Sequence, residues 1–135
     1  SPLTRRVRWI QQHYWSFLMR RIGNIKSMTE EKDQLIVQIF LDPELVWFEG
    51  HFSDQKILPG VVQISWALEF ARRFVPDAEI KETPLIKFSK PLVPEDLVTL
   101  KLVYVPEKKT VRFSYTVERP NEAASTASEG RFLLC

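Results

Sequence analysis

One of the two histidines in the chain stands where a reactive side chain would be sheltered. His51 lies between a glycine and a phenylalanine, in the order Gly50-His51-Phe52, and other aromatic residues precede it. A neutral imidazole in such surroundings has a pKa near operating pH and can take a proton from a substrate. The same histidine could also bind the loop backbone in a structural role. His51 is the candidate general base.

A Pro-Gly pair, Pro59-Gly60, opens the most hydrophobic segment of the chain, which runs from Val61 to Phe74. This segment is apolar almost all round, as expected of a helix enclosed by a sheet or by a partner subunit. The first N–H groups of a helix have no intrahelical acceptor, and the helix dipole favours negative charge there. Gly60 also lacks a Cβ, so a substrate could approach closely. A plain turn glycine before a helix would look the same in sequence, but Gly60 is the candidate donor to a developing negative charge.

The rest of the chain supplies the elements that would hold these residues. Apolar positions at helical spacing predict a short amphipathic helix from Leu3 to about Trp15. Alternating and β-branched segments predict strands at Phe17–Ile25, Gln34–Leu41, Leu85–Lys90, Leu97–Val105, Thr110–Glu118 and Ala123–Leu134, with a polar turn at Ser27–Asp33. The loop 43–59 carries too much apolar surface to be left in water, so it should pack. We expect a single α+β domain over residues 1–135, with an antiparallel sheet of about six strands around one central helix.

Composition limits the classes of partner and cofactor. The formal net charge of +2 is too small for a general nucleic-acid binder, although the residues before Glu30 are basic and form either a solvated face or a docking site for an acidic partner or a membrane surface. Two distant histidines, one cysteine and no carboxylate cluster give no metal set, and no glycine-rich phosphate loop is present. We expect no cofactor and no metal.

The single cysteine, Cys135, excludes an intramolecular disulfide and fits a reducing compartment. No apolar run approaches the roughly 20 residues that a membrane-spanning helix needs. We therefore expect a cytoplasmic protein without an integral membrane segment.

Two blocks of sequence resemble a known family. Gly50-His51-Phe52 followed by Leu58-Pro59-Gly60-Val61 resembles the active-site motif of the hot-dog-fold 3-hydroxyacyl-acyl-carrier-protein dehydratases, the FabZ-like and FabA-like enzymes. The block from Ile86 to Leu97 resembles their strand and proline corner. With Gln63 and Trp66 on its predicted central helix, the chain further resembles the dehydratases of aryl polyene biosynthesis. The resemblance covers most of the chain from about residue 13 onward and implies a hot-dog fold.

The resemblance implies dehydration of a 3-hydroxyacyl thioester, which needs a base, donors to the thioester oxygen and an acid that helps hydroxide leave. His51 would be the base and the Gly60 N–H a donor. In the family a carboxylate on the central helix meets the histidine across a dimer interface, but Ser65 stands at that position. Glu69 lies one turn further, about 6 Å along the helix axis, and is the substitute acid to consider. Gln63 and Asp54 are further polar candidates.

The resemblance also implies partners. It predicts a homodimer or dimer-based oligomer with an acyl tunnel at the interface, lined by Phe52, Pro59, Val61 and Trp66. The acyl chain would arrive on the phosphopantetheine arm of an acyl carrier protein in fatty acid or polyene biosynthesis. The acidic carrier would meet cations at the tunnel mouth, although a solvated surface role is the alternative for each of them: Arg72, Arg73, Lys87 and Lys90.

Two other functions remain open. If Ser65 is the relic of a lost acid, the chain is an acyl-binding hot-dog subunit that binds without turnover. The same scaffold can also direct water at a thioester carbonyl, which would make the chain an acyl thioesterase.

Overall fold

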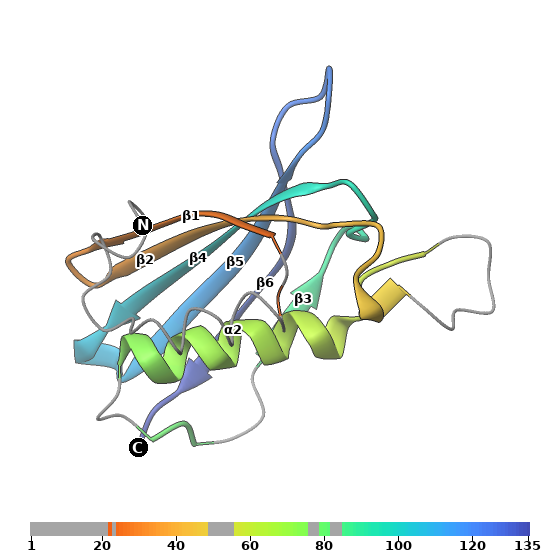
Figure 1. Ribbon diagram of the computed structural model, residues 1–135. Helices are drawn as coiled ribbons and strands as arrows, with labels where there is room; N and C mark the ends of the chain where they lie inside the picture. The colour runs from red at the N-terminus through yellow and green to blue at the C-terminus, as the bar shows by residue number, and fades with distance from the viewer. Residues whose placement is uncertain (1–21, 23, 49–55, 76–78, 82–84) are drawn as a thin grey trace.

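The computed structural model describes residues 22, 24–48, 56–75, 79–81 and 85–135, which form one antiparallel sheet and one long helix (Figure 1). The six strands are β1 (Asn24–Glu31), β2 (Gln34–Phe40), β3 (Leu85–Phe88), β4 (Leu97–Val105), β5 (Thr110–Glu118) and β6 (Ser125–Leu133). Their order in the sheet is β1-β2-β4-β5-β6-β3, so β1 and β3 are the edges. The predicted α+β architecture is confirmed. The predicted N-terminal helix lies outside the described residues.

The first hairpin differs from the prediction. β1 (Asn24–Glu31) occupies most of the expected polar turn, Ser27–Asp33, and the turn itself is only Lys32 and Asp33. Asp33 has a left-handed φ of 58°, which suits a tight turn. The predicted turn is therefore wrong.

Within the predicted strand Phe17–Ile25, Ile22 is helical rather than extended, whereas Asn24 and Ile25 are the first residues of β1. β1 was difficult to recognise because a register irregularity between Ile25 and Ser27 breaks its alternation. Its buried apolar residues, Ile25 and Met28, are therefore three positions apart rather than two.

The later strands follow the predicted pattern. β4 and β5 have the predicted bounds, and β6 begins two residues after the predicted Ala123 and ends at Leu133. Side chains alternate along β4, where Val98, Leu100 and Leu102 are fully buried and Lys101 between them is exposed. One face of the sheet therefore forms the core and the other faces outward.

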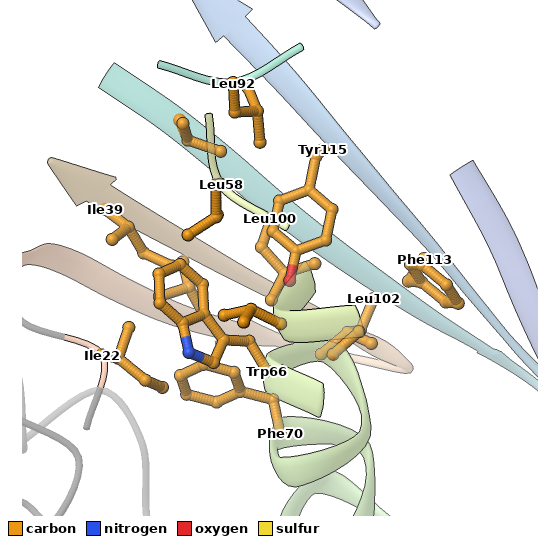
Figure 2. Close-up of a cluster of buried hydrophobic side chains, with 14 of the residues drawn as sticks. Ile22, Ile39, Leu58, Trp66, Phe70, Leu92, Leu100, Leu102, Phe113 and Tyr115 are labelled. Carbon is orange, nitrogen blue, oxygen red and sulfur yellow. The ribbon is translucent and has the colours of Figure 1, made fainter. Parts of the chain in front are cut away.

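The helix α2 (Gly60–Phe74) lies along the core face of the sheet (Figure 1), as the apolar segment Val61–Phe74 predicted. Six of its residues are buried: Val62, Gln63, Trp66, Ala67, Phe70 and Ala71. Figure 2 shows Trp66 and Phe70 among Ile22 and side chains of the sheet, including Leu100 and Leu102. The sheet thus wraps the helix.

The proline corner between β3 and β4 holds the start of α2 in place. The Leu58 N–H donates to the Leu92 carbonyl oxygen at 2.8 Å. The corner is fixed by the Asp96 carboxylate, which accepts the Val93 N–H at 2.8 Å and two guanidinium N–H groups of Arg119, each at 2.8 Å. In the described parts of the preceding loop, the 3-10 turn η2 (Val46–Phe48) buries Phe48, and Leu58 is 2% exposed, whereas Ile57 is exposed.

Candidate active site

The predicted site has two halves, and the structure describes one of them. His51, Phe52 and Asp54 lie outside the described residues. The described half consists of the segment Lys56–Pro59 and the N-terminal turns of α2, which include the predicted donor, Gly60.

Pro59 is the N-cap of α2 and has an extended backbone, with φ −59° and ψ 145°. Its carbonyl oxygen accepts the N–H groups of Val62 and Gln63, at 3.0 and 3.2 Å. No side chain caps this end, and the Gly60 N–H has no acceptor among the described residues. An uncapped first turn leaves donors and the positive end of the helix dipole for an anionic oxygen.

Gly60 is required by packing as well. A Cβ built on Gly60 would stand 2.6 Å from Cζ of Phe88, at the end of β3. From the sequence alone, the missing Cβ is expected to let a substrate approach closely. In this chain the space beside the Gly60 Cα is occupied by the Phe88 ring, so the glycine also lets β3 lie against the start of α2.

Ser65 is exposed and lies on the outward side of α2, four residues after Val61, which is 73% exposed. Residues four apart share a helix face, so both point away from the core. Glu69 lies one turn further on and is half-buried, with an interaction of its own. The position expected to carry an acid therefore faces outward, where a second chain could meet it.

Gln63 occupies the opposite side of α2 and is 3% exposed. Its Nε2 donates to the Leu58 carbonyl oxygen at 3.2 Å, and its Oε1 accepts the Ser128 hydroxyl at 2.7 Å. The Tyr115 hydroxyl donates to the Gln63 backbone carbonyl oxygen at 2.6 Å. The amide thus links the segment before Gly60 to β6.

The hydroxyl of Tyr115 stays neutral in this network. Burial raises the pKa of Tyr115 well above its usual value, and a hydrogen bond with the Ala67 backbone lowers it by less. Tyr115 is fully buried on the core face of β5 (Figure 2). It acts as a fixed hydrogen-bond donor to the first turns of α2.

Sequence reasoning missed Tyr115 and Ser128. The available signals are local: Tyr115 falls on the inward-facing phase of β5, and Ser128 ends a run of small residues that begins at Ala123. Within this run, Ala127 and Ser128 are fully buried, whereas Ala123 and Ala124 are exposed and precede β6. The alternation predicts burial, but it does not say that both side chains meet Gln63.

The remaining candidates are spread over the fold. Trp66 is 4% exposed and packs in the core. Arg72 and Arg73 are exposed in the last turn of α2, about 18 Å along the helix from Gly60. Lys87 is exposed on β3, and the Lys90 ammonium donates to the Ser125 hydroxyl at 3.0 Å. Because β3 lies at the opposite end of α2, the four predicted carrier-binding cations do not form one cluster.

An apolar surface remains uncovered beside the start of α2. Phe88 is 50% exposed on β3, Val61 is 73% exposed, and Leu85 at the other end of β3 is 62% exposed. β3 is an edge strand that pairs only with β6 within the described part of the chain. An apolar edge of this kind is a template for pairing with another chain.

Within the described segments, no group of three or more histidine, cysteine, aspartate or glutamate side chains could hold a metal ion. None of the helices described is long and apolar enough to cross a membrane.

Comparisons with known proteins indicate one family and one fold. The family model of the ApeI-like proteins, described as ApeI dehydratase, matches residues 27–130. A solved structure described as the dehydratase heterocomplex ApeI:P from Xenorhabdus doucetiae is 32% identical, with a TM-score of 0.72, covering 83% of this chain and 96% of that one. An uncharacterised protein from Erwinia carotovora subsp. atroseptica is 29% identical, with a TM-score of 0.70, covering 83% and 92%.

A more distant structure shows the fold alone. The dehydratase domain from the CurK module of curacin polyketide synthase is 14% identical, with a TM-score of 0.65, covering 87% of this chain and 44% of that one. No curated protein matches the chain in sequence. Family model, identity and architecture agree: the chain belongs to the ApeI-like family of hot-dog dehydratases.

Proposed function

We propose that the chain is a dehydratase subunit that removes water from a 3-hydroxyacyl thioester carried on the phosphopantetheine arm of an acyl carrier protein. The observation that carries the proposal is the uncapped start of α2, where the Gly60 N–H has no acceptor among the described residues. Membership of a dehydratase family supports the reaction class. The carrier, the acyl chain and the placement in fatty acid or polyene biosynthesis come from the sequence resemblance.

The reaction needs three groups. His51 takes the proton from the carbon next to the thioester carbonyl, and the electron pair moves toward the carbonyl oxygen. The Gly60 N–H and the dipole of α2 stabilise the negative charge on that oxygen. The bond to the 3-hydroxyl then breaks, and an acid delivers the proton that turns hydroxide into water.

Ser65 cannot supply that proton, because a serine hydroxyl is a far weaker acid than a carboxylic acid. Its outward-facing position suggests where the acid comes from. In the FabZ-like pattern the histidine of one chain meets the central helix of the other. A second hot-dog chain with a carboxylate at the position of Ser65 would therefore complete the His51 site, whereas a second copy of this chain would bring another serine.

Two observations support pairing with a different hot-dog chain. The apolar edge at β3 and the exposed Val61 provide a surface for a partner. The relative from Xenorhabdus doucetiae is described as a heterocomplex. The tunnel between the chains would take the acyl group past Phe52, Pro59 and Val61, with Trp66 closing its inner wall from the core.

The test is incubation with 3-hydroxyacyl and with enoyl carrier-protein substrates, followed by mass spectrometry. Loss or gain of about 18 Da is the expected result for dehydration or its reverse, from the mass of one water. His51→Ala should abolish the reaction, and retained turnover would refute the assignment of the base. Ser65→Glu should raise the activity of the chain alone, because it restores a carboxylate on α2.

The exposed serine at the acid position also favours a second candidate, an acyl-binding subunit without turnover. This function predicts that the chain binds acyl carrier protein and leaves both substrates unchanged, alone or with a partner chain. Ser65→Glu would then have no effect. Release of free acid instead would identify a thioesterase.

A further inference from the structure

The outward face of the sheet, opposite α2, carries a groove that contains none of the proposed reacting groups, although its lining includes Lys87, one of the predicted carrier-binding cations. The groove has a volume of about 730 Å³ and extends over β3, β4, β5 and β6, with Lys108 from the turn between β4 and β5 at one side. These four strands are neighbours in the sheet, in the order β4-β5-β6-β3 (Figure 1). Three strand spacings make the groove about 14 Å wide, which accommodates an α-helix of about 10 Å diameter.

The charged residues of the groove are nearly all cations. Its lining includes five exposed lysines and arginines and one carboxylate: Lys87, Lys101, Lys108, Arg112, Arg131 and Glu129. The whole chain has a formal net charge of only +2. The groove is therefore a local concentration of positive charge on an otherwise nearly balanced molecule, which favours an anionic occupant.

The register of the strands places two of these cations side by side. Arg112 of β5 lies directly opposite Arg131 of β6, and its other neighbour, on β4, is the apolar Val103. Like charges directly opposite each other destabilise a sheet. Over the part of the chain that the structure describes, no ion pair involves either arginine. Two unneutralised guanidinium groups one strand apart form a fork that suits carboxylate oxygens.

We propose that this groove, defined by the six charged residues above, docks a carboxylate-rich segment of a partner protein. Single-stranded nucleic acid is less suited, because sheets that bind it present exposed aromatic rings for stacking, and the aromatic ring in this lining, that of Phe113, is 2% exposed. A second copy of the chain would bring the same positive face and be repelled. The floor contains Val103 and Val105, apolar groups that a protein segment would cover.

The test uses the intact chain and a carboxylate-rich peptide, poly-L-glutamate, with an oligothymidylate of equal charge and anionic phospholipid vesicles as alternative probes. Arg112→Glu combined with Arg131→Glu should weaken peptide binding at least about tenfold in a calorimetric titration. The matched control is Lys32→Glu with Lys81→Glu, which changes net charge equally at exposed sites outside the groove. The control should change binding less than about twofold.

A second variant separates binding from folding. Arg112→Glu alone replaces a like-charge pair by an opposite-charge pair with Arg131, so it should raise the melting temperature by about 2–4 °C while weakening the peptide complex. Equal losses in the groove and control variants would show only a net-charge effect and overturn the proposal. Preference for the oligothymidylate or the vesicles, or no binding of the peptide at all, would overturn it as well. None of these outcomes depends on dehydratase activity.

Discussion

The buried amide of Gln63 gives the sharpest test of how the start of α2 is held. Gln63→Met keeps the length of the side chain and removes both polar atoms. The Leu58 carbonyl oxygen and the Ser128 hydroxyl then lose the partners they have at 3.2 and 2.7 Å. Both groups lie in the interior, because Leu58 is 2% exposed and Ser128 is fully buried, so water cannot replace the amide without rearrangement.

The magnitude follows from the two orphaned groups. Each buried donor or acceptor left without a partner costs about 1–3 kcal/mol, and burying the apolar methionine end group returns about 1 kcal/mol. We expect Gln63→Met to lower the free energy of unfolding by about 2–3 kcal/mol. Ser128→Ala alone should cost about 1 kcal/mol. The double variant should cost less than the sum by about 1 kcal/mol, because one orphaned group has been removed.

The measurement is urea denaturation of the unsubstituted protein, the two single variants and the double variant, compared at an unchanged m-value. Gln38→Met is a matched control, because Gln38 also accepts a serine hydroxyl, that of Ser27 at 3.1 Å, but on a partly exposed strand. The control should cost less than about 0.5 kcal/mol. If the losses in unfolding free energy from Gln63→Met and Ser128→Ala are strictly additive, the two side chains are not energetically coupled, and the positioning role of Gln63 is refuted.

Three further predictions concern the residues that hold the start of α2 and the proline corner in place. Tyr115→Phe should lower the free energy of unfolding by about 1 kcal/mol at neutral pH. Because burial raises the pKa of Tyr115 in the folded state, its contribution to stability is complete below about pH 10 and falls as the pH rises. When stability is measured against pH, the variant should therefore lose less stability at alkaline pH than the unsubstituted protein. Asp96→Asn should cost about 2 kcal/mol in thermal unfolding, because Arg119 loses its bidentate carboxylate, and an unchanged melting temperature would contradict this role of the corner. Gly60→Ala should lower the free energy of unfolding by about 1 kcal/mol, because the added methyl group displaces the Phe88 ring. Combining it with Phe88→Ala should remove that cost. If Gly60→Ala still destabilises the protein when Phe88 is alanine, the clash with Phe88 is not the cause.

Most of the fold could be predicted because its signals are local. The apolar segment of α2, the alternation of β4 and β5, and the prolines of the corner each reveal an element within a few residues of sequence. The bounds of β1 were not predicted correctly, because the irregularity between Ile25 and Ser27 interrupts the local alternation on which the prediction depends. The exact end of a strand such as β3, which stops at Phe88, depends on its pairing with β6.

The site was less predictable because its contacts join distant residues. Gln63 meets Tyr115 and Ser128, which are 52 and 65 residues away along the chain. Local patterns predict that each of these residues is buried, but not that they meet. The helix start at Gly60 was predicted as an anion-stabilising end, and its uncapped geometry is consistent with that use. The base assigned to His51 stays a prediction.

The outward position of Ser65 has a consequence for how this family can change. A side chain that packs against nothing in its own core can be exchanged without a folding penalty, so a carboxylate can be lost or regained there in a single substitution. Gln63, two residues earlier on the buried side of the same helix, has no such freedom, because its amide is hydrogen-bonded to Leu58 and Ser128. Under the proposed mechanism, the acid position and the buried network thus lie on opposite sides of α2, and a gene duplication could divide the reacting groups between two chains while each copy still folds.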